Sequence, residues 1–405
     1  MKNILFIILI SLSYSCSKST AETNITKPKT PLMGWASWNN YHININEDII
    51  KKQADFMVSS GMKEAGYTFI NIDDGFFGGR DSLGNLIAHP TRFPSGMRNL
   101  SDYIHSKGLK AGIYSDAGIN TCGSYWDKDT ISMGSGMYGH ERMDIFKMLD
   151  TWNYDFLKID WCGGQWLDLD EQTHYTKIGK LITEIKPGTL YNICRWEFPG
   201  KWAIPIADSW RISGDISNKF KSILHIIDLN AHLWMHSSPG HVNDMDMLQV
   251  GRGMTLDEDK AHFSMWCMLN SPLLAGNDLS SMSQQTIDIL TNKKIIALNQ
   301  DILGYQARRL IKTDSVEVWA KPLVHTMSGK IAVTLLNRSD TSATFTFDVK
   351  KVGLKAEMGY TMEDLWSNKN YEIQTDKALT FTVPSHGVVV LKITGTSENF
   401  NPFQH

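Results

Sequence analysis

Several apolar segments of this chain end in an aspartate, and this repetition limits the folds that the chain can form. The segment Asp155–Cys162 reads Asp-Phe-Leu-Lys-Ile-Asp-Trp-Cys, and Lys158 and Asp160 share one face by the two-residue period of a strand. Similar apolar segments with a strand-end carboxylate are Asn71–Asp74, Ile113–Asp116 and Trp210–Asp215. A barrel of parallel strands gathers such strand-end side chains at one mouth, where it builds its active site.

Strand-like and helix-like segments alternate along most of the chain. The expected strands are Pro31–Trp38, Thr68–Asp73, Lys110–Asp116, Asp155–Trp161, Thr189–Arg195, Ser209–Asp215, Leu233–Ser238 and Leu273–Asp278. The expected helices are Glu47–Ser60, Met97–Lys107, His140–Thr151, Asp170–Lys186, Ser217–Ala231, Asp257–Asn270 and Met282–Thr291. This alternation predicts a (β/α)8 barrel, a TIM barrel of the α/β class, over residues 30–305. A doubly wound open sheet is the competing fold, but no glycine-rich phosphate loop follows the first strand.

The pattern changes after the barrel. Residues 308–397 contain segments that alternate with a period of two, and glycine, serine, asparagine and aspartate separate them. The clearest are Val316–Ala320, Ile331–Leu336, Ala343–Val349 and Val388–Ile393. We therefore expect a C-terminal antiparallel β-sandwich with a supporting role, because no catalytic residue types cluster in its strands.

The N-terminus has the pattern of an export signal. A lysine precedes the apolar run Ile4–Leu12, and residues 1–15 are too short to span a bilayer, which is typical of a signal peptide. The small residue before Cys16 resembles a bacterial lipoprotein cleavage site, so Cys16 would carry a lipid and residues 16–29 would form a polar tether. We expect a periplasmic or outer-membrane-anchored lipoprotein, and ordinary secretion is the alternative.

Charge and cysteine usage narrow the function further. The net charge of −3 over 405 residues gives no reason to expect nucleic acid as a partner. No C-x-x-C pair or clustered His/Cys spacing is present, so we expect no metal site and no cofactor. Cys122 and Cys162 follow neighbouring strands of the expected barrel, where a disulfide between them would fit. Cys194 ends the next strand and would face the site as a free thiol.

Asp160 by itself has two interpretations. Charged side chains on a buried strand face cost free energy unless they are paired or used in chemistry. A buried ion pair with Lys158, or a cap at the strand end, would explain the residue as well as catalysis would.

Seven motifs in a fixed order favour catalysis. They are Thr30–Asn39, Asn71–Asp74, Gly108–Gly118, Asp155–Asp160, Trp210–Ile216, Asn243–Leu248 and Leu298–Asp301. With these motifs the chain resembles the retaining glycoside hydrolases related to α-galactosidases, family 27 of clan D, from about Thr30 to Gln306. The resemblance implies a barrel with a C-terminal β domain and a carbohydrate substrate.

The resemblance also implies the roles of the two main carboxylates. Asp160 would be the nucleophile and Asp215 the general acid/base of a double displacement. Lys158 would favour the ionised form of Asp160 as a neighbouring cation, and Arg211 should lie on the side of Asp215.

Other matching positions would hold the sugar. Asp73 and Asp74 resemble the pair that binds hydroxyls at the far side of the sugar, where a carboxylate accepts two charge-assisted hydrogen bonds. Trp35 resembles the aromatic wall of the sugar pocket. Without the resemblance, strand-end capping would explain the two aspartates, and core packing would explain the tryptophan. Packing, capping or support would also explain four further strand-end residues: Tyr114, Asp116, Asp244 and Asp246.

The chain departs from the family pattern at the rim of this pocket. Galactose-specific members usually have Cys-Glu-Trp after the fifth strand, whereas this chain has Cys194-Arg195-Trp196-Glu197. Either Glu197 takes the usual role near the sugar 2-hydroxyl, or Arg195 meets a different substituent. The segment 75–80 also lacks the usual cysteine and tryptophan.

These features predict an exo-acting retaining glycosidase that removes terminal α-D-galactose from oligosaccharides or glycans. On the same scaffold, β-L-arabinopyranosidase, α-N-acetylgalactosaminidase and isomalto-dextranase activities remain alternatives. A surface lectin is a different class, which the presence of both Asp160 and Asp215 disfavours, because a binder needs no acid/base. A metal-dependent hydrolase would need a ligand set that the sequence does not offer.

Overall fold

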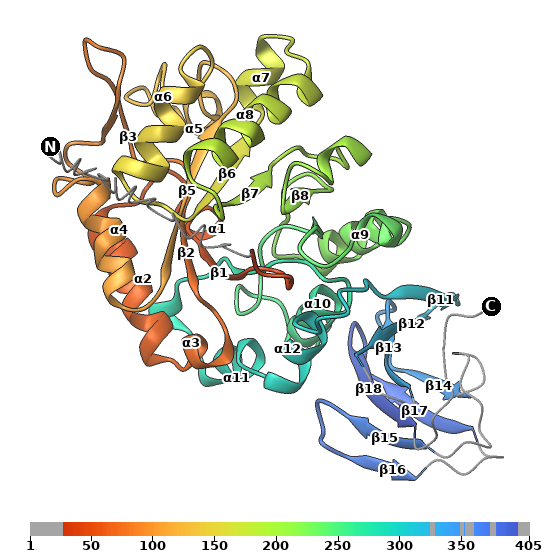
Figure 1. The fold of residues 1–405 in the computed structure, drawn as a ribbon. Coiled ribbons are helices and arrows are strands. Elements are labelled where there is room, and N and C mark those ends of the chain that lie inside the picture. Colours follow the sequence, from red (N-terminus) through yellow and green to blue (C-terminus); the bar gives the residue numbers. More distant parts are fainter. Residues whose placement is uncertain (1–26, 325–328, 349–351, 353–359, 373–377, 396–405) are drawn as a thin grey trace, which may run out of the picture.

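The computed structural model describes residues 27–324, 329–348, 352, 360–372 and 378–395. A barrel with surrounding helices comes first, and a smaller all-β domain lies beside it at the C-terminal end of the chain (Figure 1). The predicted signal peptide, Cys16 and most of the predicted tether lie outside the described residues.

Eight parallel strands form the barrel. In chain order they are β1 (Met33–Ala36), β2 (Phe69–Ile72), β5 (Lys110–Asp116), β6 (Phe156–Asp160), β7 (Leu190–Ile193), β8 (Ser209–Arg211), β9 (Val242–Asp244) and β10 (Leu273–Ala275). The sheet order is β10-β1-β2-β5-β6-β7-β8-β9. It closes through a parallel bridge between Leu248, which follows β9, and Ala275 of β10. The barrel class predicted from the sequence is confirmed.

Helices cover the outside of this barrel. The longer ones are α2 (Glu47–Ser59), α4 (Met97–Ser106), α6 (Glu141–Phe146) with the π-helical turn η1 (Lys147–Thr151), α8 (Glu171–Ile185), α9 (Phe220–Asn230), α10 (Leu256–Met268), α11 (Gln284–Leu290) and α12 (Lys293–Asn299). Short helices are α1 (Trp38–Tyr41), α3 (Met62–Ala65), α5 (Cys122–Trp126) and α7 (Cys162–Trp166), and a hairpin joins β3 (Phe77–Arg80) to β4 (Leu86–Ala88).

Local sequence explains where these helices begin. Asn46 caps α2 by accepting a hydrogen bond from the Ile49 backbone N–H at 2.8 Å. Thr255 and Glu258 form a capping box at the start of α10. Helix α10 is buried on nearly all sides because the barrel lies on one side and strands β13 and β18 of the C-terminal domain on the other.

The prediction for the seventh strand is wrong. Leu233–Ser238 contains the 3-10 turn η3 (Trp234–His236), where the Met235 side chain is exposed, and the strand is β9 instead. The polar Asn243 in the middle of β9 interrupts the apolar pattern, so the sequence did not predict a strand there. Its amide group is buried and fully paired, because it donates to the Leu233 carbonyl and to Gln306 and accepts from the Trp210 indole. The hairpin β3–β4, helix α12 and the short helices were also absent from the prediction.

The C-terminal domain consists of two antiparallel sheets. The larger has the order β11 (Arg308–Lys312), β12 (Val316–Leu323), β13 (Lys330–Asn337), β18 (Val388–Gly395), β15 (Tyr360–Asp364) and β16 (Asn370–Glu372). The smaller pairs β14 (Ala343–Phe347) with β17 (Leu379–Val383). Apolar side chains of both sheets form a second core. The predicted β-sandwich is confirmed.

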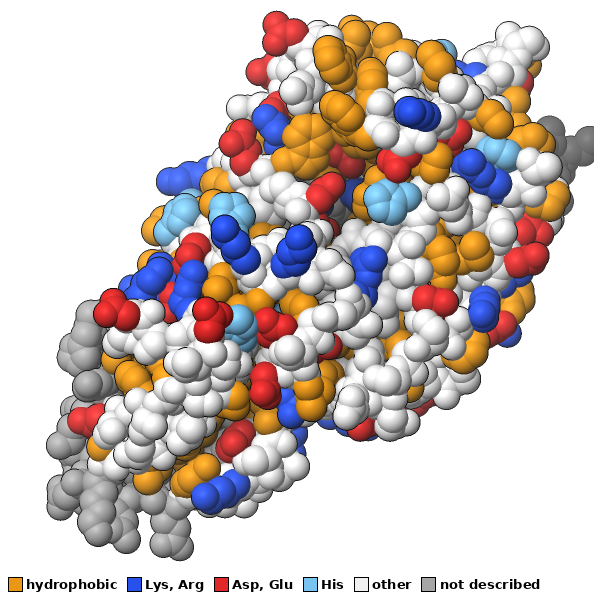
Figure 2. All heavy atoms as spheres, turned by 180° about the vertical axis from the view of Figure 1, so that it is seen from behind, with side chains coloured by type: hydrophobic (Ala, Val, Ile, Leu, Met, Phe, Trp, Pro, Cys, Tyr) orange, Lys and Arg blue, Asp and Glu red, His pale blue; other side chains and the backbone are white. Residues whose placement is uncertain are grey.

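The surface carries charges of both signs. Figure 2 shows acidic and basic side chains interspersed on the face seen from behind, with no large area of one sign. This arrangement agrees with the net charge of −3. Within the described ranges, every helix is too short or too polar to cross a lipid bilayer.

Candidate active site

A cavity of about 620 Å³ opens at the carboxyl ends of the barrel strands. It collects side chains from the segments that follow β1, β2, β5, β6, β7, β8 and β9. Its lining residues are Trp38, Asn39, His42, Asp73, Tyr114, Cys122, Trp126, Asp127, Lys158, Asp160, Cys162, Trp196, Arg211, Gly214, Asp215, Asp246 and Met247. A narrow cavity of about 30 Å³ inside the barrel shares several of these residues, so its position marks the deep end of the site.

Asp160 is the last residue of β6 and lies in the cavity wall. Its strand neighbour in the register is Asp116 of β5, and its carboxylate accepts a hydrogen bond from the Trp161 backbone N–H at 3.0 Å. Burial raises the pKa of Asp160 to about 6 even though the Lys158 ammonium acts in the opposite direction. Asp160 is therefore a weakly solvated carboxylate, which suits a nucleophile.

Asp215 lies in a different electrostatic environment. The Arg211 Nη2 group donates to Asp215 Oδ1 at 3.0 Å and is also 3.0 Å from Asp246 Oδ2. Partial desolvation by the cavity wall acts to raise the pKa of Asp215, but Arg211 and Lys158 outweigh it, so the pKa lies below its usual value. The Asp215 side chain is 65 % exposed, which places it at the mouth of the cavity rather than at its base.

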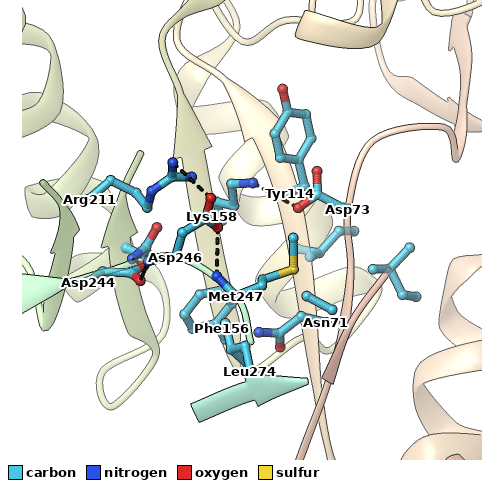
Figure 3. Close-up of a pocket in the computed structure, with 14 residues that line it drawn as sticks. Asn71, Asp73, Tyr114, Phe156, Lys158, Arg211, Asp244, Asp246, Met247 and Leu274 are labelled. Atoms are coloured by element: carbon cyan, nitrogen blue, oxygen red, sulfur yellow. Dashed lines mark hydrogen bonds and ion pairs between the residues drawn. The ribbon is translucent and has the colours of Figure 1, made fainter. Parts of the chain in front are cut away.

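Lys158 and Asp73 form an ion pair at the deep end. Lys158 Nζ donates to Asp73 Oδ2 at 2.8 Å, and the same ammonium lies 5.2 Å from the centre of the Tyr114 ring. Figure 3 shows this pair opposite the pair formed by Arg211 and Asp246. Burial acts to lower the pKa of Lys158, but Asp73 and its neighbouring acids raise it well above the usual value, so the amine is charged.

Asp74, which the resemblance places beside a sugar hydroxyl, lies outside the lining of this cavity. Its side chain is fully buried and does not line the cavity; it accepts from the backbone N–H groups of Gly75 at 2.8 Å and Gly123 at 2.7 Å. Burial raises its pKa to about 7. Asp116 has a similar function, because it accepts from Gly118 at 2.7 Å and Gly163 at 2.9 Å. Both carboxylates hold the loops that carry the cavity wall.

Trp35 is also a core residue rather than a pocket wall. It is completely buried, and its indole donates to the Asn277 carbonyl at 2.7 Å, which ties β1 to the segment after β10. The tryptophans that line the cavity are Trp38, Trp126 and Trp196. An inward position in a barrel strand is buried below the mouth, so the aromatic wall comes from the loops beyond the strand ends.

In the rim segment after β7, Trp196 lines the cavity, whereas Arg195 and Glu197 do not. Arg195 Nε donates to Glu171 Oε1 at 2.5 Å and Nη2 donates to Glu197 Oε1 at 3.3 Å, and neither Arg195 nor Glu197 lines the cavity. Cys194 is a buried free thiol that accepts from Arg211 Nη1 at 3.8 Å. The ion pair with Glu171 on α8 holds Arg195 outside the cavity lining, and the buried Cys194 is not part of that lining either. Trp196 takes the inward position instead.

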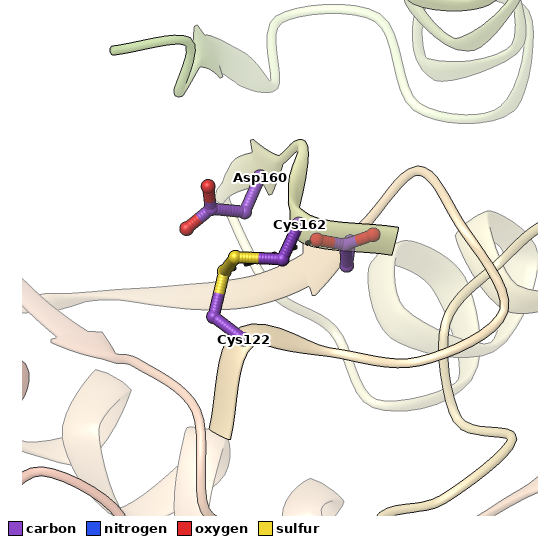
Figure 4. A group of neighbouring side chains, drawn as sticks. Cys122, Asp160 and Cys162 are labelled. Atoms are coloured by element: carbon purple, nitrogen blue, oxygen red, sulfur yellow. Dashed lines mark hydrogen bonds between the residues drawn. A yellow bond between two sulfur atoms is a disulfide. The ribbon is translucent and has the colours of Figure 1, made fainter. Parts of the chain in front are cut away.

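A disulfide joins Cys122 to Cys162, as expected from the strand order (Figure 4). Asp116 and Asp160 lie beside it, and ligand atoms of these four residues are within 4.8 Å of one another. The two sulfurs are bonded to each other, so they are not thiolate ligands for a metal ion.

Several cavity residues were not predicted as site residues. His42 accompanies Asp127 at the rim, with Nδ1 and Oδ1 3.2 Å apart. Asp246 had been assigned to capping; it does accept from the Met247 and Ile216 backbone N–H groups, but it also pairs with Arg211. The only sequence signal for Trp126 was its position four residues after a predicted disulfide cysteine.

The comparisons with known proteins agree with this geometry. Residues 30–301 match the family described as alpha galactosidase A, and residues 313–393 match the alpha galactosidase C-terminal beta sandwich domain. The α-galactosidase A of Cellvibrio japonicus is 41 % identical over 389 residues, which cover 90 % of this chain and 92 % of the relative. α-Galactosidase 2 of Arabidopsis thaliana is 42 % identical over 370 residues, which cover 90 % and 89 %.

The solved structure of α-galactosidase I from Mortierella vinacea superimposes with a TM-score of 0.82 at 31 % identity, covering 93 % of this chain and all of that structure. The family match spans the complete barrel and includes both Asp160 and Asp215. This chain belongs to the α-galactosidase family of glycoside hydrolases.

Proposed function

We propose that this protein is a retaining exo-α-galactosidase in which Asp160 is the nucleophile and Asp215 the general acid/base. The observation that carries the proposal is that both carboxyl groups line one cavity in unlike surroundings. Asp160 is buried beside the Lys158 ammonium, and Asp215 lies at the open end. A retaining glycosidase needs two such groups on either side of the scissile bond.

In the first step, the Asp160 carboxylate attacks the anomeric carbon. Asp215 gives its proton to the glycosidic oxygen, the bond from that oxygen to the sugar breaks, and the alcohol leaves. The sugar remains as an ester of Asp160. Free Asp215 has a lowered pKa, but bound substrate displaces water from its exposed carboxyl group and so favours the protonated form.

In the second step, Asp215 takes a proton from water as the water oxygen attacks the anomeric carbon. The ester bond breaks and Asp160 is released as a carboxylate. The esterified Asp160 carries no charge, so it no longer raises the pKa of Asp215, and Arg211 keeps Asp215 ionised for its role as a base.

The deep end of the cavity supports recognition of sugar hydroxyls. The Asp73 carboxylate accepts hydrogen bonds, and the Lys158 ammonium donates them, at 2.8 Å from each other. Because both groups are held by an ion pair, they are positioned before the substrate enters. A pocket closed at this end accepts the terminal residue of a glycan and not an internal one.

Rates on a panel of para-nitrophenyl glycosides test the proposal. We expect the α-D-galactoside to be hydrolysed fastest, and the β-L-arabinopyranoside and the α-N-acetylgalactosaminide more slowly. Proton NMR of the first product should show α-galactose before mutarotation, because two inversions retain configuration. A β-configured first product would reject the double displacement, and faster hydrolysis of another glycoside would reject the specificity.

We also propose that the protein is exported and anchored through Cys16. The basic residue before Ile4–Leu12 and the small residue before Cys16 support this proposal. In a bacterial host, the full chain should fractionate with membranes, and Cys16→Ala should release the activity to the soluble fraction. Mass spectrometry of an unmodified N-terminal peptide containing Cys16 would contradict the anchor.

A further inference from the structure

Two tryptophans stand exposed beside the catalytic cavity. Trp126 is 68 % exposed and Trp166 is 66 % exposed, and Trp126 itself lines the cavity with Asp160 and Asp215. Tryptophan is the side chain with the most apolar area to lose from water, so exposure of this degree is unusual when two occur together. An exposed apolar surface next to a binding site is typical of a surface that a ligand covers.

The two tryptophans occupy equivalent positions at the ends of two short helices, α5 and α7. Trp126 is the fifth and last residue of α5, and Trp166 is the fifth and last residue of α7. Each helix begins with one cysteine of the disulfide, so the bond fastens the two helices together at their first residues. The ring of Tyr125 lies 5.9 Å from the ring of Trp166, which joins the two helices again at their last turn.

Backbone hydrogen bonds fix this pair of helices relative to the nucleophile. Gly163 in α7 donates to Asp116, the strand neighbour of Asp160, and Gly123 in α5 donates to Asp74 at the end of β2. Both carboxylates are completely buried. The aromatic rings are therefore held by the barrel itself, and little conformational freedom is lost when a ligand covers them.

Depth in the cavity decides which part of a substrate reaches these rings. Asp73, Lys158 and Arg211 line both the main cavity and the narrow one below it, and so mark the deep end. Trp126 and Asp215 are among the exposed residues of the lining, together with His42 and Gly214. In an exo-acting enzyme the terminal galactose fills the deep end, so the leaving group passes the acid/base and extends over the mouth.

We propose that Tyr125, Trp126 and Trp166 form a binding platform for the leaving-group side of the substrate, with Trp126 contacting the first sugar ring beyond the cleaved bond and Trp166 the second. This inference rests on the proposed function. It assigns the substrate class as α-galactosyl oligosaccharides or polysaccharide branches, because flat aromatic faces match the C–H faces of successive sugar rings. Asp127 and His42, 3.2 Å apart at the same rim, provide polar partners for hydroxyls of that leaving group.

A series of substrates that lengthens beyond the cleaved bond tests the platform. α-Galactosyl fluoride has no sugar there, melibiose has one ring, and raffinose has two. Trp126→Ala should lower kcat/KM about tenfold on both melibiose and raffinose, the effect of losing one stacking contact. Trp166→Ala should act on raffinose and not on melibiose, and both variants should keep the wild-type rate on the fluoride.

Two control variants make the result specific. Trp126→Phe retains a flat ring and should restore most of the loss on melibiose. Met235→Ala removes an apolar side chain that is 59 % exposed but does not line the cavity, and it should change no rate. Equal losses on the fluoride and the oligosaccharides would overturn the platform, because the tryptophans would then shape the galactose site.

Unchanged rates on both oligosaccharides in the double variant Trp126→Ala/Trp166→Ala would overturn it as well. A different result would reject the proposed α-galactosidase function itself: the wild-type enzyme would then not hydrolyse α-galactosyl fluoride at all.

Discussion

Two lysines in two regions of this molecule, Lys158 partly buried and Lys321 fully buried, have different partners. At the barrel mouth, Lys158 Nζ donates to the Asp73 carboxylate at 2.8 Å. At the interface between the domains, Lys321 of β12 is completely buried and donates to the Cys267 backbone carbonyl at 3.3 Å and to the side-chain oxygen of Asn270. The first lysine donates to a charged group, and the second donates to neutral groups.

Burial acts to lower the pKa of both amines, but the outcomes are opposite. Carboxylates raise the pKa of Lys158 well above its usual value, whereas burial lowers the pKa of Lys321 to about 7. The comparison teaches that burial alone does not decide the charge of a lysine; the neighbouring carboxylates do. The mouth holds charged groups in position for chemistry, and the interface holds an amine that loses its proton near neutral pH.

The largest effect is expected when the nucleophile of the mouth is removed. Asp160→Asn should lower kcat by about 10⁴-fold, because the amide cannot form the glycosyl ester. Circular dichroism and the thermal midpoint should show an intact fold, since a buried carboxyl group with a raised pKa is replaced by a neutral side chain of equal size. A variant with more than a tenth of the wild-type kcat would remove Asp160 from the mechanism.

The second prediction replaces each of the two lysines, in separate variants, with methionine. Lys158→Met leaves Asp73 without its ion-pair partner, so kcat/KM should fall about 10²- to 10³-fold and the free energy of unfolding by about 3 kcal/mol. The matched variant Lys321→Met should leave kcat/KM within about twofold, because this residue lies far from the cavity lining. Steady-state kinetics and urea denaturation of both variants measure the contrast. An equal loss of activity in the two variants would contradict it.

The third prediction concerns the pH dependence of activity. The productive form has Asp160 ionised and Asp215 protonated, so the two carboxyl groups together must hold one proton. The pKa of Asp160 is raised to about 6 and that of Asp215 is lowered, so the pair loses its last proton at about pH 6. Above that pH, kcat/KM should fall about tenfold per unit.

The Asp215→Ala variant provides the control for this profile. α-Galactosyl fluoride needs no general acid, so the fall above pH 6 should disappear for this variant with the fluoride. A wild-type profile that stays flat to pH 8 would show that the last proton of the pair is held more tightly than the surroundings of Asp160 indicate.

The last prediction concerns the interface lysine, which should change no rate and act only on stability. The folded pKa of Lys321 is about 7, below the unfolded value of 10.5, so between these values the unfolded chain binds more protons than the folded one. Its contribution therefore becomes more favourable as pH rises, by about 1.4 kcal/mol per unit between pH 7 and 10. The difference in unfolding free energy between wild type and Lys321→Met isolates this slope, because other groups titrate equally in both. A constant difference would show that the amine remains charged in the fold.

The fold could be predicted from the sequence where apolar periodicity was strong. Strands such as β5 and β6 are nearly continuous apolar segments, and their predicted bounds are close to those observed. β9 could not be found in this way, because its central residue is an asparagine whose partners come from residues far away in the chain. Short apolar segments such as Leu233–Ser238 resemble strands in sequence, and only pairing with a neighbour distinguishes them.

The residues of the candidate site also fall into those whose location could be predicted from the sequence and those whose location could not. Asp160, Asp215, Lys158 and Arg211 were placed correctly in one cavity, since strand position and residue type together fix where these side chains lie. Asp74 follows the cavity residue Asp73, and Trp35 precedes the cavity residue Trp38. Both side chains are buried outside the lining and are hydrogen-bonded to backbone groups. A difference of one to three residues along the chain separates a side chain in the cavity lining from one outside it.

The sequence by itself determined the architecture and the chemistry of this protein, because the period of its apolar residues sets the elements and the ends of those elements carry the carboxylates. Only the tertiary structure decided which side chains of the rim face the cavity and which of them lie together. Whether Arg195 reaches the sugar depends on Glu171, which is 24 residues away in the chain, and whether two tryptophans act together depends on a disulfide between helices that begin 40 residues apart. Such pairings are long-range contacts between loops, and no local pattern specifies them.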